Sequence, residues 1–479
     1  MLFNSIEFAL FFPIVCGLYF TVLSKHQIGL LLLSSCVFYM AFVPSYILIL
    51  GTTIAIDYAA GIYLERTTGR TRTLILIGSI VATCLILFLF KYYFFFVSAF
   101  TGLASLIGWH PEFPRLSIIL PIGLSFHTFQ SLSYVVEVYR SRQKAEHNFA
   151  TYATFVMFFP QLVAGPIERP QNLLHQFGET YGFDYSRVVS GLKRMAWGFF
   201  KKLVIADRLA LYVNDVYASP SSFNGLQLTI ATVFFAYQIY CDFSGYSDIA
   251  IGSARVLGYK LMENFDSPYA SRSISEFWRR WHISLSTWFK DYIYVPLGGS
   301  RGTRLSLVRN LLITFGISGL WHGASWNYVI WGLQNGMYLV FGALRGKARP
   351  NSPAEGGAAQ AHWMRTAVQI GTTFTLICLA WVPFRANTLS EAGYILTHLA
   401  SDWDFTAVKT QNFHLKQFAP AVCGVVLLEI LQLLNRQGRL RPSLRSLAPP
   451  LQWMVYIGFI LTIILFGVYS SHSFIYFQF

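Results

Sequence analysis

Charged residues are scarce in this chain of 479 residues, at 12% of the sequence where soluble domains carry about 25%. Hydrophobic residues account for 54% and aromatic residues for 17%, a balance that excludes an ordinary soluble enzyme. Acidic residues are the scarcer kind, 22 against 36 Lys and Arg, so the formal charge is +14. In a soluble protein such an excess suggests a nucleic-acid partner. Basic residues spread thinly through apolar sequence instead favour a membrane protein surrounded by lipids, with no nucleic acid.

The sequence also lacks interdomain linkers and paired cysteines. Its length alone suggests roughly three soluble domains, but no Gly/Ser-rich or acidic stretch separates them, so residues 1–479 are predicted to form one membrane domain. The cysteines show no CxxC pair and no zinc-like spacing with histidine, which argues against a disulfide framework and against a metal site. They are Cys16, Cys36, Cys84, Cys241, Cys378 and Cys423. Residues 1–4 lack the basic start of a signal peptide, so the first apolar run is expected to be retained.

Apolar runs close to the length of a membrane-spanning helix, about 20 residues, recur along the whole chain. Six are clear, at 2–23, 74–90, 116–136, 367–384, 418–434 and 454–468. Five more are shorter or interrupted, at 28–43, 45–62, 226–240, 305–321 and 328–344. The sequence therefore predicts an all-α polytopic membrane protein with roughly eleven membrane helices.

Lysine and arginine gather in four loops, at 66–72, 140–144, 345–349 and 436–445. Basic residues near the ends of spans accumulate on the cytoplasmic side of the membrane. All four loops can lie there if both termini are extracytoplasmic. The segments 98–115 and 385–415 are then extracytoplasmic loops, and residues 471–479 form an extracytoplasmic tail, called the C-terminal tail below.

Two segments in the middle of the chain have a different character. Residues 191–212 mix lysine and arginine with large apolar residues, which is typical of an amphipathic helix at the cytoplasmic interface or of a solvated basic helix end. Residues 263–301 are too polar for a lipid-facing span and are broken by Pro268, Pro296 and two glycines. Such backbone is tolerated at membrane depth only inside protein or along a cavity. We therefore predict a re-entrant or cavity-lining segment.

Two histidines lie where chemistry is plausible. His322 sits at the junction of two apolar helices, and His282 sits in an aromatic and basic stretch. Neutral imidazole is the form that a general base needs, and polar groups at membrane depth usually line a site or a pathway. Composition alone leaves a packing role and a catalytic role for these histidines equally open.

Carboxylates and hydroxyls follow one of the apolar runs, at Asp242, Ser244, Tyr246 and Asp248. This set could bind a cation, relay protons or cap a helix. Glu276 precedes Arg280 by four residues, so the two could pair along a helix.

A second group of basic residues could bind the phosphates of a nucleotide-like cofactor from the cytoplasmic side. These residues are Arg279, Arg280, Lys290 and Arg301. The sequence contains no Walker A motif, no GxGxxG fingerprint and no HExxH motif, so it gives no support to an ATPase, a dehydrogenase or a zinc protease. The absence of a GxSxG elbow argues against a serine acyl intermediate of the hydrolase type.

Three motifs resemble the signature of the membrane-bound O-acyltransferase (MBOAT) superfamily, in its bacterial alginate and peptidoglycan O-acetyltransferase branch. They are FSGYSD at 243–248, EFWRRWHISLSTW at 276–288 and GLWHG at 319–323. Four shorter motifs agree, namely AGPI at 164–167, MENF at 262–265, WVPFRA at 381–386 and FIYFQF at 474–479. The resemblance extends from the first apolar run to the last residue.

The resemblance implies a helical core around a central tunnel, entry of acetyl-CoA from the cytoplasm, and a buried catalytic histidine at His322, next to Trp321. Alginate-type members often carry a second histidine on the following helix, where this chain has Asn335. An acid–base role at that position is therefore in doubt. His282 is expected to be the second important histidine, in a structural or tunnel-lining role.

The resemblance also implies a relay in the bacterial cytoplasmic membrane, in which an extracytoplasmic SGNH-hydrolase-like partner delivers the acetyl group to a glycan, within a polysaccharide-synthesis or export complex. Tyr476 carries the only hydroxyl of the aromatic run 474–479 in the C-terminal tail, and such tails are proposed acyl shuttles; the alternative is an interfacial anchor. Two rival functions remain, a transporter or flippase that uses Asp242, Asp248 and Glu276, and a non-catalytic assembly subunit. The acceptor glycan, whether alginate, peptidoglycan or another surface polysaccharide, is not fixed by the sequence.

Overall fold

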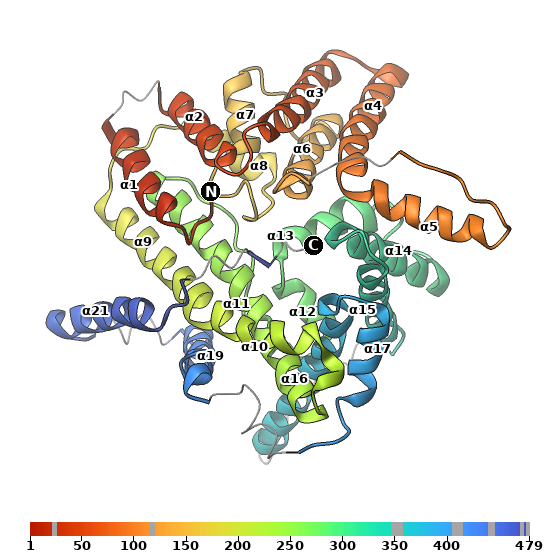
Figure 1. Cartoon of the computed structure of the whole chain (residues 1–479). Helices are drawn as coiled ribbons and strands as arrows, with labels where there is room; N and C mark the ends of the chain where they lie inside the picture. The colour runs from red at the N-terminus through yellow and green to blue at the C-terminus, as the bar shows by residue number, and fades with distance from the viewer. Residues whose placement is uncertain are drawn as a thin grey trace. The chain divides into compact units, whose positions relative to one another are not determined.

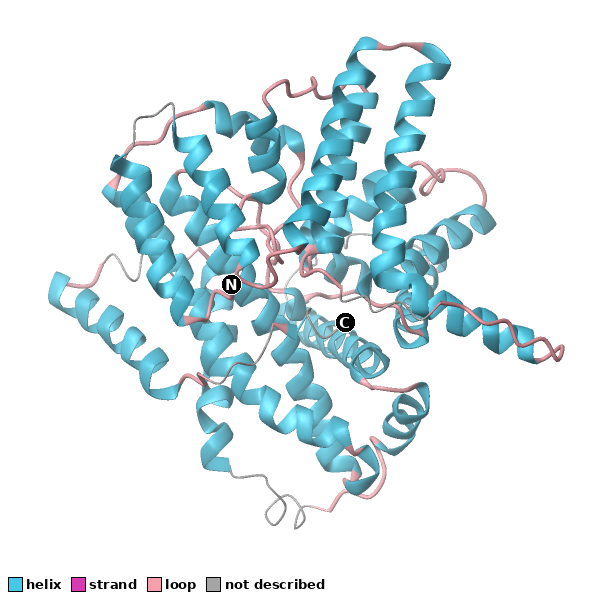
Figure 2. Cartoon of the chain, turned by 45° about the horizontal axis from the view of Figure 1, so that its top comes forward, coloured by secondary structure: helices cyan, strands magenta, loops and turns pink. Residues whose placement is uncertain are grey.

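The computed structural model describes residues 1–21, 26–114, 120–345, 358–404, 415–438, 446–469 and 474–475. In these residues the regular structure is helical, and no strand occurs (Figures 1 and 2). Tyr476 lies outside the described residues, as do most of the third and fourth basic loops, 346–349 and 439–445.

Every apolar run that the sequence offers contains a helix. These helices are α1 (Ile6–Thr21), α2 (Gln27–Met40), α3 (Tyr46–Arg66), α4 (Gly69–Leu87), α6 (Leu124–Tyr139), α11 (Gly225–Leu257), α14 (Arg304–His322), α15 (Trp326–Leu344), α16 (Ala358–Arg385), α19 (Leu415–Arg436) and α21 (Pro449–Phe466). The prediction of helix at these positions is therefore confirmed.

Fewer of these helices are long and apolar enough to cross a membrane. Among the described residues five meet that test, at Tyr46–Arg66, Gly69–Ser105, Trp363–Arg385, Gln417–Arg436 and Pro449–Phe466, while α1 and α2 are shorter apolar helices. Helix length and composition thus do not support the expected number of about eleven spans. The physical reason is that α6 has 16 residues, while α11, α14 and α15 bury polar side chains that lower their hydropathy.

The two segments predicted to be extracytoplasmic loops contain helices. The segment 98–115 begins inside α5 (Tyr93–Ser105), which continues α4 through the π-helical turn η2 (Phe88–Tyr92). The segment 385–415 contains α17 (Leu389–His398). The Thr388 side chain accepts a hydrogen bond from the Glu391 backbone N–H, and the Glu391 carboxylate accepts one from the Asn387 N–H. This is a capping box, a sequence signal for a helix start that hydropathy alone does not reveal.

The chain divides into two compact units, each described here by itself. Unit 1 comprises residues 1–195 and 246–262, and unit 2 comprises residues 196–245 and 263–475. The helices α9 (Tyr185–Phe199) and α11 each continue from one unit into the other.

In unit 1 the helices α3, α4 and α6 pack against one another (Figure 1). Asp57 of α3 is fully buried and accepts hydrogen bonds from the hydroxyls of Ser79 (2.5 Å) and Thr83 (3.2 Å), both on α4. A carboxylate inside a membrane helix must find its partners within the protein, so these hydroxyls fix α3 and α4 face to face.

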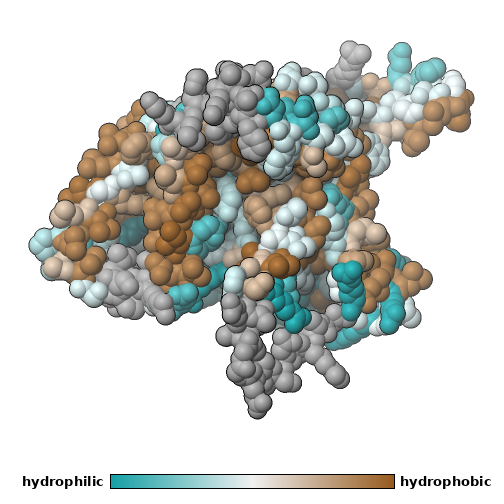
Figure 3. Space-filling model, turned by 90° about the horizontal axis from the view of Figure 1, so that it is seen from below, coloured by the Kyte–Doolittle hydropathy of each residue, from teal (hydrophilic) through white to brown (hydrophobic). Residues whose placement is uncertain are grey.

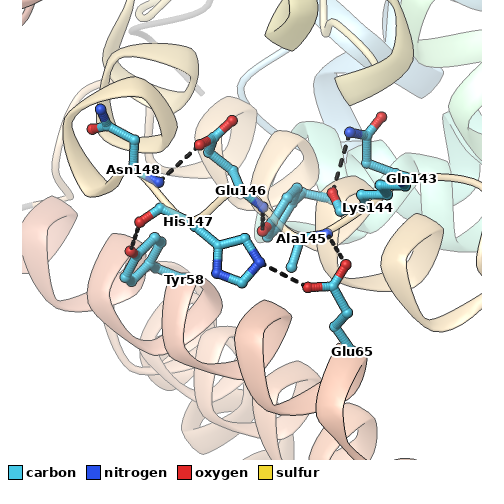
Figure 4. A network of polar contacts seen from close by, with 9 residues as sticks. Tyr58, Glu65, Gln143, Lys144, Ala145, Glu146, His147 and Asn148 are labelled. Carbon is cyan, nitrogen blue, oxygen red and sulfur yellow. Dashed lines mark hydrogen bonds and ion pairs between the residues drawn. The ribbon is translucent and has the colours of Figure 1, made fainter.

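The loop after α6 is tied to the end of α3 (Figure 4). The Glu65 carboxylate accepts the Ala145 backbone N–H at 3.3 Å and lies 2.9 Å from His147 Nε2. Arg72 donates to the Val138 carbonyl oxygen at 3.0 Å. Two of the four basic loops, 66–72 and 140–144, therefore lie together, as loops on one side of a membrane must.

The outward-facing side chains of the apolar helices are large and hydrophobic. Ile6 and Leu10 of α1 are 79% and 64% exposed, and Leu465 of α21 is 70% exposed. Apolar side chains also cover much of the face drawn in Figure 3. Soluble monomers rarely expose contiguous apolar surface of this extent, so this is a multi-pass membrane protein whose helices face lipid.

Unit 2 is organised around an antiparallel hairpin of α14 and α15, joined by the short turn 323–325 (Figure 1). Glycines permit the two backbones to touch. A Cβ on Gly319 would lie 2.2 Å from the Tyr328 carbonyl oxygen, and a Cβ on Gly332 would lie 2.2 Å from the Phe315 carbonyl oxygen. Only glycine allows this approach, which brings the end of α14 directly onto α15.

We expect Gly332→Ala to separate the hairpin, because its methyl group would overlap the α14 backbone. Overpacking of this kind costs about 1–3 kcal/mol, and thermal unfolding in detergent, followed by tryptophan fluorescence, should show a lower midpoint. Gly342→Ala on the same helix is the matched control, because its Cβ meets nothing within 4 Å. It should be neutral or slightly stabilising, since alanine is the better helix former by about 1 kcal/mol. Equal midpoints for the two variants would contradict the close packing.

Candidate active site

His322 is the last residue of α14 and is 4% exposed. Its Nδ1 donates a hydrogen bond to the Ser318 carbonyl oxygen, one helical turn earlier, at 2.7 Å. The imidazole ring centre lies 4.7 Å from that of Trp331 on α15, and 5.7 Å from that of Phe384 on α16. The hairpin and α16 thus enclose this imidazole in aromatic rings.

The hydrogen bond to Ser318 fixes the chemistry of the His322 ring. A carbonyl oxygen is an acceptor, so the ring proton sits on Nδ1 and the lone pair is on Nε2. Surrounding aromatic rings exclude water and disfavour the charged imidazolium. A neutral imidazole with its lone pair on Nε2 is the form that accepts a proton in general base catalysis.

His282 belongs to the same unit and is fully buried. It precedes α13 (Ile283–Phe289) in a left-handed conformation, with φ 44°. The Asn264 side-chain oxygen receives the Ser284 backbone N–H at 3.2 Å and the Ser284 hydroxyl at 2.8 Å, and lies 3.1 Å from His282 Nδ1. Asn264, from the MENF motif, therefore holds the histidine and the start of α13 in place.

Trp321 links the two histidines. Its ring centre lies 6.2 Å from that of His282 and 4.9 Å from that of His322, and the tryptophan is 3% exposed. The structure thus brings together His282, Trp321 and His322, three residues that the sequence singled out. It assigns His282 a buried position held by Asn264, in agreement with a structural role.

Tryptophans from two motifs and from α15 complete this aromatic core. The ring centre of Trp331 lies 5.8 Å from that of Trp278 on α12 (Ile274–Arg280) and 5.8 Å from that of Trp381 on α16, and Trp281 lies 5.1 Å from Trp381. The motifs at 276–288, 319–323 and 381–386 therefore converge in space. Within residues 263–301, the short helices α12 and α13 bury aromatic side chains such as Phe277, Trp278 and Trp288.

Asn335 lies one turn beyond Trp331 on α15 and is 1% exposed. Its amide nitrogen donates to the Trp331 carbonyl oxygen at 2.8 Å, while its buried side-chain oxygen has no hydrogen-bond partner in the described part of the chain. The asparagine side chain does not ionise near neutral pH. Asn335 therefore offers a buried hydrogen-bond acceptor and not an acid–base group.

A buried ionic cluster lies elsewhere in unit 2. Lys202 Nζ lies 2.7 Å from Asp242 Oδ1 and 2.8 Å from Asp207 Oδ1, and all three residues are buried. Burial raises the pKa of Asp207 to about 7, against the opposing effect of Lys202. Nearby, Lys201 Nζ donates to the Ser244 hydroxyl at 2.9 Å. One ammonium group thus serves two carboxylates.

The buried lysines correct the prediction for residues 191–212. Lys201 and Lys202 lie in η4 (Phe200–Ala206), a π-helical segment between α9 and α10 (Asp207–Ala218), and they point into the protein and not to a membrane interface. Gly245 makes the pairing possible, because a Cβ there would lie 2.8 Å from the Gly198 carbonyl oxygen. The carboxylates of α11 can therefore reach η4.

The carboxylates that a transporter would need are each paired with a cation. Asp242 pairs with Lys202, Glu276 with Arg280 at 2.6 Å, and Asp248, in unit 1, with Arg194. Tyr246, also in unit 1, packs its ring 4.5 Å from that of Phe3. The expected pairing of Glu276 with Arg280 along one helix is confirmed.

The basic residues expected to bind phosphate differ in exposure. Arg279, Lys290 and Arg301 are exposed, while Arg280 is half-buried in its pair with Glu276. Arg301 follows Gly298 and Gly299, whose φ angles are 108° and 59°, and the Gly299 carbonyl oxygen accepts the Asn310 side-chain N–H at 2.9 Å. The loop that carries Arg301 is therefore fixed, and its side chain is accessible.

We expect Asn264→Ala to lower activity by about tenfold or more, because the change leaves the buried donors of Ser284 without an acceptor, at a cost of about 1–3 kcal/mol. The measurement is the initial rate of acyl transfer with substrate in excess. Ser284→Ala removes only the hydroxyl and should cause a smaller loss. A fully active Asn264→Ala protein would show that the position of His282 does not matter to the reaction.

These features define a helical integral membrane protein with a neutral, aromatic-enclosed histidine as its candidate catalytic base. The chain belongs to the membrane-bound O-acyltransferase family, whose model matches residues 83–353. The family assignment made from the motifs is thus confirmed, and the protein is a membrane acyltransferase.

Relatives of known name are similar over most of the chain. A probable alginate O-acetylase AlgI of Pseudomonas aeruginosa is 38% identical over 422 residues, covering 86% of this chain and 78% of that protein. A peptidoglycan O-acetyltransferase of Helicobacter pylori is 34% identical, covering 76% and 72%. A teichoic acid D-alanyltransferase of Bacillus subtilis is 26% identical over a shorter region, covering 55% and 66%.

Sequence reasoning missed some residues that shape the site. Trp331 and Phe384 enclose His322, but each is one aromatic residue among many in an apolar helix. Lys202 resembled an interfacial lysine, because one of its carboxylate partners, Asp242, lies far away in the sequence. Its other partner, Asp207, is close enough in the sequence to suggest pairing. Distances across the fold, and not local patterns, reveal these roles.

Proposed function

We propose that this acyltransferase moves an acetyl group from cytoplasmic acetyl-CoA across the membrane to an extracytoplasmic acceptor. The observation that carries the proposal is the His322 imidazole, whose Nδ1 proton is bound to the Ser318 carbonyl and whose ring is enclosed by Trp331 and Phe384. This arrangement suits removal of a proton from a hydroxyl nucleophile away from water.

In the proposed reaction His322 Nε2 accepts the hydroxyl proton while the hydroxyl oxygen forms a bond to the thioester carbonyl carbon. The carbon–sulfur bond then breaks, and the imidazolium gives its proton to the departing thiolate. The histidine returns to its starting state, and the products are an acetyl ester and free CoA. General base catalysis of this kind contributes about 10²–10⁴-fold to the rate.

Acetyl-CoA is the proposed donor because the exposed basic residues Arg279, Lys290 and Arg301 offer cations to its phosphates. Guanidinium groups bind phosphate through paired, charge-assisted hydrogen bonds. Arg280 has a smaller part, since Glu276 already neutralises it. The same unit holds these cations and His322.

Tyr476 is the proposed first acceptor. Phe474 and Ile475, the residues before it, are each 2% exposed, and the Phe474 ring centre lies 5.7 Å from that of Phe243. Phe243 in turn lies 4.5 Å from the ring centre of His282. Phe474 and Ile475 therefore lie in the unit that contains both histidines, which supports a shuttle better than an interfacial anchor.

The acetyl group is proposed to pass from the tail to an SGNH-hydrolase-like partner and then to alginate, peptidoglycan or a similar surface polysaccharide. The names of the relatives support this acceptor class, because two of them act on alginate or peptidoglycan. The proposed setting is the bacterial cytoplasmic membrane, with both termini extracytoplasmic. The proximity of loops 66–72 and 140–144 is consistent with that orientation.

A labelling experiment tests the proposal directly. Purified protein incubated with [¹⁴C]acetyl-CoA should release CoA and carry label on Tyr476, located by mass spectrometry of the C-terminal peptide. In His322→Ala both signals should fall by about 10²-fold or more, because the general base is lost. Tyr476→Phe should remove the label from the tail and abolish glycan acetylation in cells.

The matched control is His175→Ala, which removes an exposed histidine outside the aromatic core. Its labelling should equal that of the parent chain. Full CoA release and full labelling in His322→Ala would refute the catalytic assignment, and full glycan acetylation by Tyr476→Phe would refute the shuttle while leaving the role of His322 intact.

The donor site makes a separate kinetic prediction. The double change Arg279→Ala with Arg301→Ala should raise the KM for acetyl-CoA several-fold with little change in kcat, because phosphate binding contributes equally to ground and transition states. Higher salt should also raise the KM of the parent enzyme for acetyl-CoA, because it screens the attraction between these cations and the phosphates. Arg70→Ala, an exposed arginine of unit 1, is the control. An unchanged KM in the double variant would exclude these residues from donor binding.

A further inference from the structure

The backbone of the C-terminal tail is bound to the buried ionic cluster of unit 2. The Ile475 N–H donates to Asp242 Oδ2 at 2.9 Å, in a fully buried contact. The other carboxylate oxygen, Oδ1, lies 2.7 Å from Lys202 Nζ. Asp242 thus uses one oxygen for the lysine and the other for the tail.

The rest of the segment approaches along the same elements. The Val468 backbone N–H donates to the Leu203 carbonyl oxygen of η4 at 3.0 Å. The Phe474 ring packs on Phe243, the residue after Asp242. The segment is therefore held at Val468 by η4 and at Phe474 and Ile475 by α11.

The charge of the cluster suits this binding. A single ammonium, on Lys202, lies between the carboxyl groups of Asp207 and Asp242, so the two acidic side chains share it. A buried carboxylate gains stability from each further donor, and hydrogen bonds to charged groups are about twice as strong as neutral ones. The Ile475 N–H supplies such a donor to Asp242.

We propose that Asp242, oriented by Lys202, is a positioning residue that anchors the C-terminal tail through the Ile475 N–H and so sets the place of the adjacent Tyr476. The anchor itself follows from the contacts above, and its effect on acyl transfer rests on the proposed function. Tyr476 follows Ile475 directly, so the anchor restrains the tyrosine within one residue of a fixed point.

Two pairs of variants isolate the anchor. Ile475→Pro removes the backbone N–H, and it also replaces the side chain and fixes φ, whereas Ile475→Val keeps the N–H. Asp242→Ala removes the acceptor, whereas Asp57→Asn alters a buried carboxylate of α3 that accepts hydrogen bonds from Ser79 and Thr83. Asp242→Asn keeps an acceptor oxygen and should rescue part of what Asp242→Ala loses.

Hydrogen–deuterium exchange of the C-terminal peptide measures the anchor without reference to activity. In the full-length protein in detergent, Asp242→Ala should speed exchange of the tail amides by about tenfold or more, since a hydrogen bond to a charged acceptor is lost. Asp57→Asn should leave tail exchange unchanged. Tail exchange in Asp242→Ala as slow as in the parent chain would overturn the proposal.

Acyl transfer tests the consequence. In Ile475→Pro the kcat for labelling of Tyr476 from acetyl-CoA should fall by about tenfold or more, with the KM for acetyl-CoA unchanged, while Ile475→Val should match the parent chain. A merely structural role would lower the unfolding midpoint and the amount of active protein without this split. Full labelling in Ile475→Pro would overturn the positioning role.

Failure of the proposed function gives a different result. If Tyr476→Phe supports full acetylation, the shuttle is wrong, and the exchange experiment still decides whether Asp242 anchors the tail. If Tyr476 is labelled but tail exchange does not respond to Asp242→Ala, the shuttle stands and the anchor is wrong.

Discussion

A polar group buried among membrane helices has no water to bind, so it is stabilised by a partner within the protein. This constraint explains features that hydropathy does not. Asp57 draws the hydroxyls of α4 onto α3, and Lys202 draws two carboxylates to η4. His322 finds its acceptor within its own helix, at the Ser318 carbonyl. Because that bond uses Nδ1, the proton of this buried ring has an acceptor, and the proposed role of His322 as general base falls to Nε2.

Close backbone contact is the second requirement of the site, and glycine provides it. Gly319 and Gly332 allow α14 and α15 to touch, and Gly245 allows α11 to approach α9 and η4. In the first case the result is that Trp331 reaches His322. In the second the result is that Lys202 reaches Asp242. Glycines within helices are usually destabilising, so their presence in GLWHG and FSGYSD marks places where packing gain exceeds that cost.

Helix positions, family and the central histidine could be predicted from the sequence, because each is encoded locally. Apolar runs of sufficient length become helices, and GLWHG places His322 at a helix end. The number of spans could not be predicted, because apolar length does not distinguish a lipid-facing helix such as α21 from a helix with buried polar residues such as α11. The role of Lys202 was interpreted wrongly for a related reason, since the contact that buries it comes from a distant helix. Asp242, Asp248 and Glu276 looked like one acidic set, yet each pairs with its own cation.

Pairing of buried polar groups and close backbone contact occur together at FSGYSD. Gly245 brings α11 onto η4, the approach pairs Asp242 with Lys202, and the pairing leaves Asp242 Oδ2 to accept the Ile475 N–H. Phe243 then contacts Phe474 on one side and His282 on the other. FSGYSD and the Asp242 before it therefore connect Phe474 and Ile475 to the histidine core. An acyl carrier at the end of a chain needs such a connection, because a free terminus samples many positions and restricting it to one raises its effective concentration at the reacting carbon.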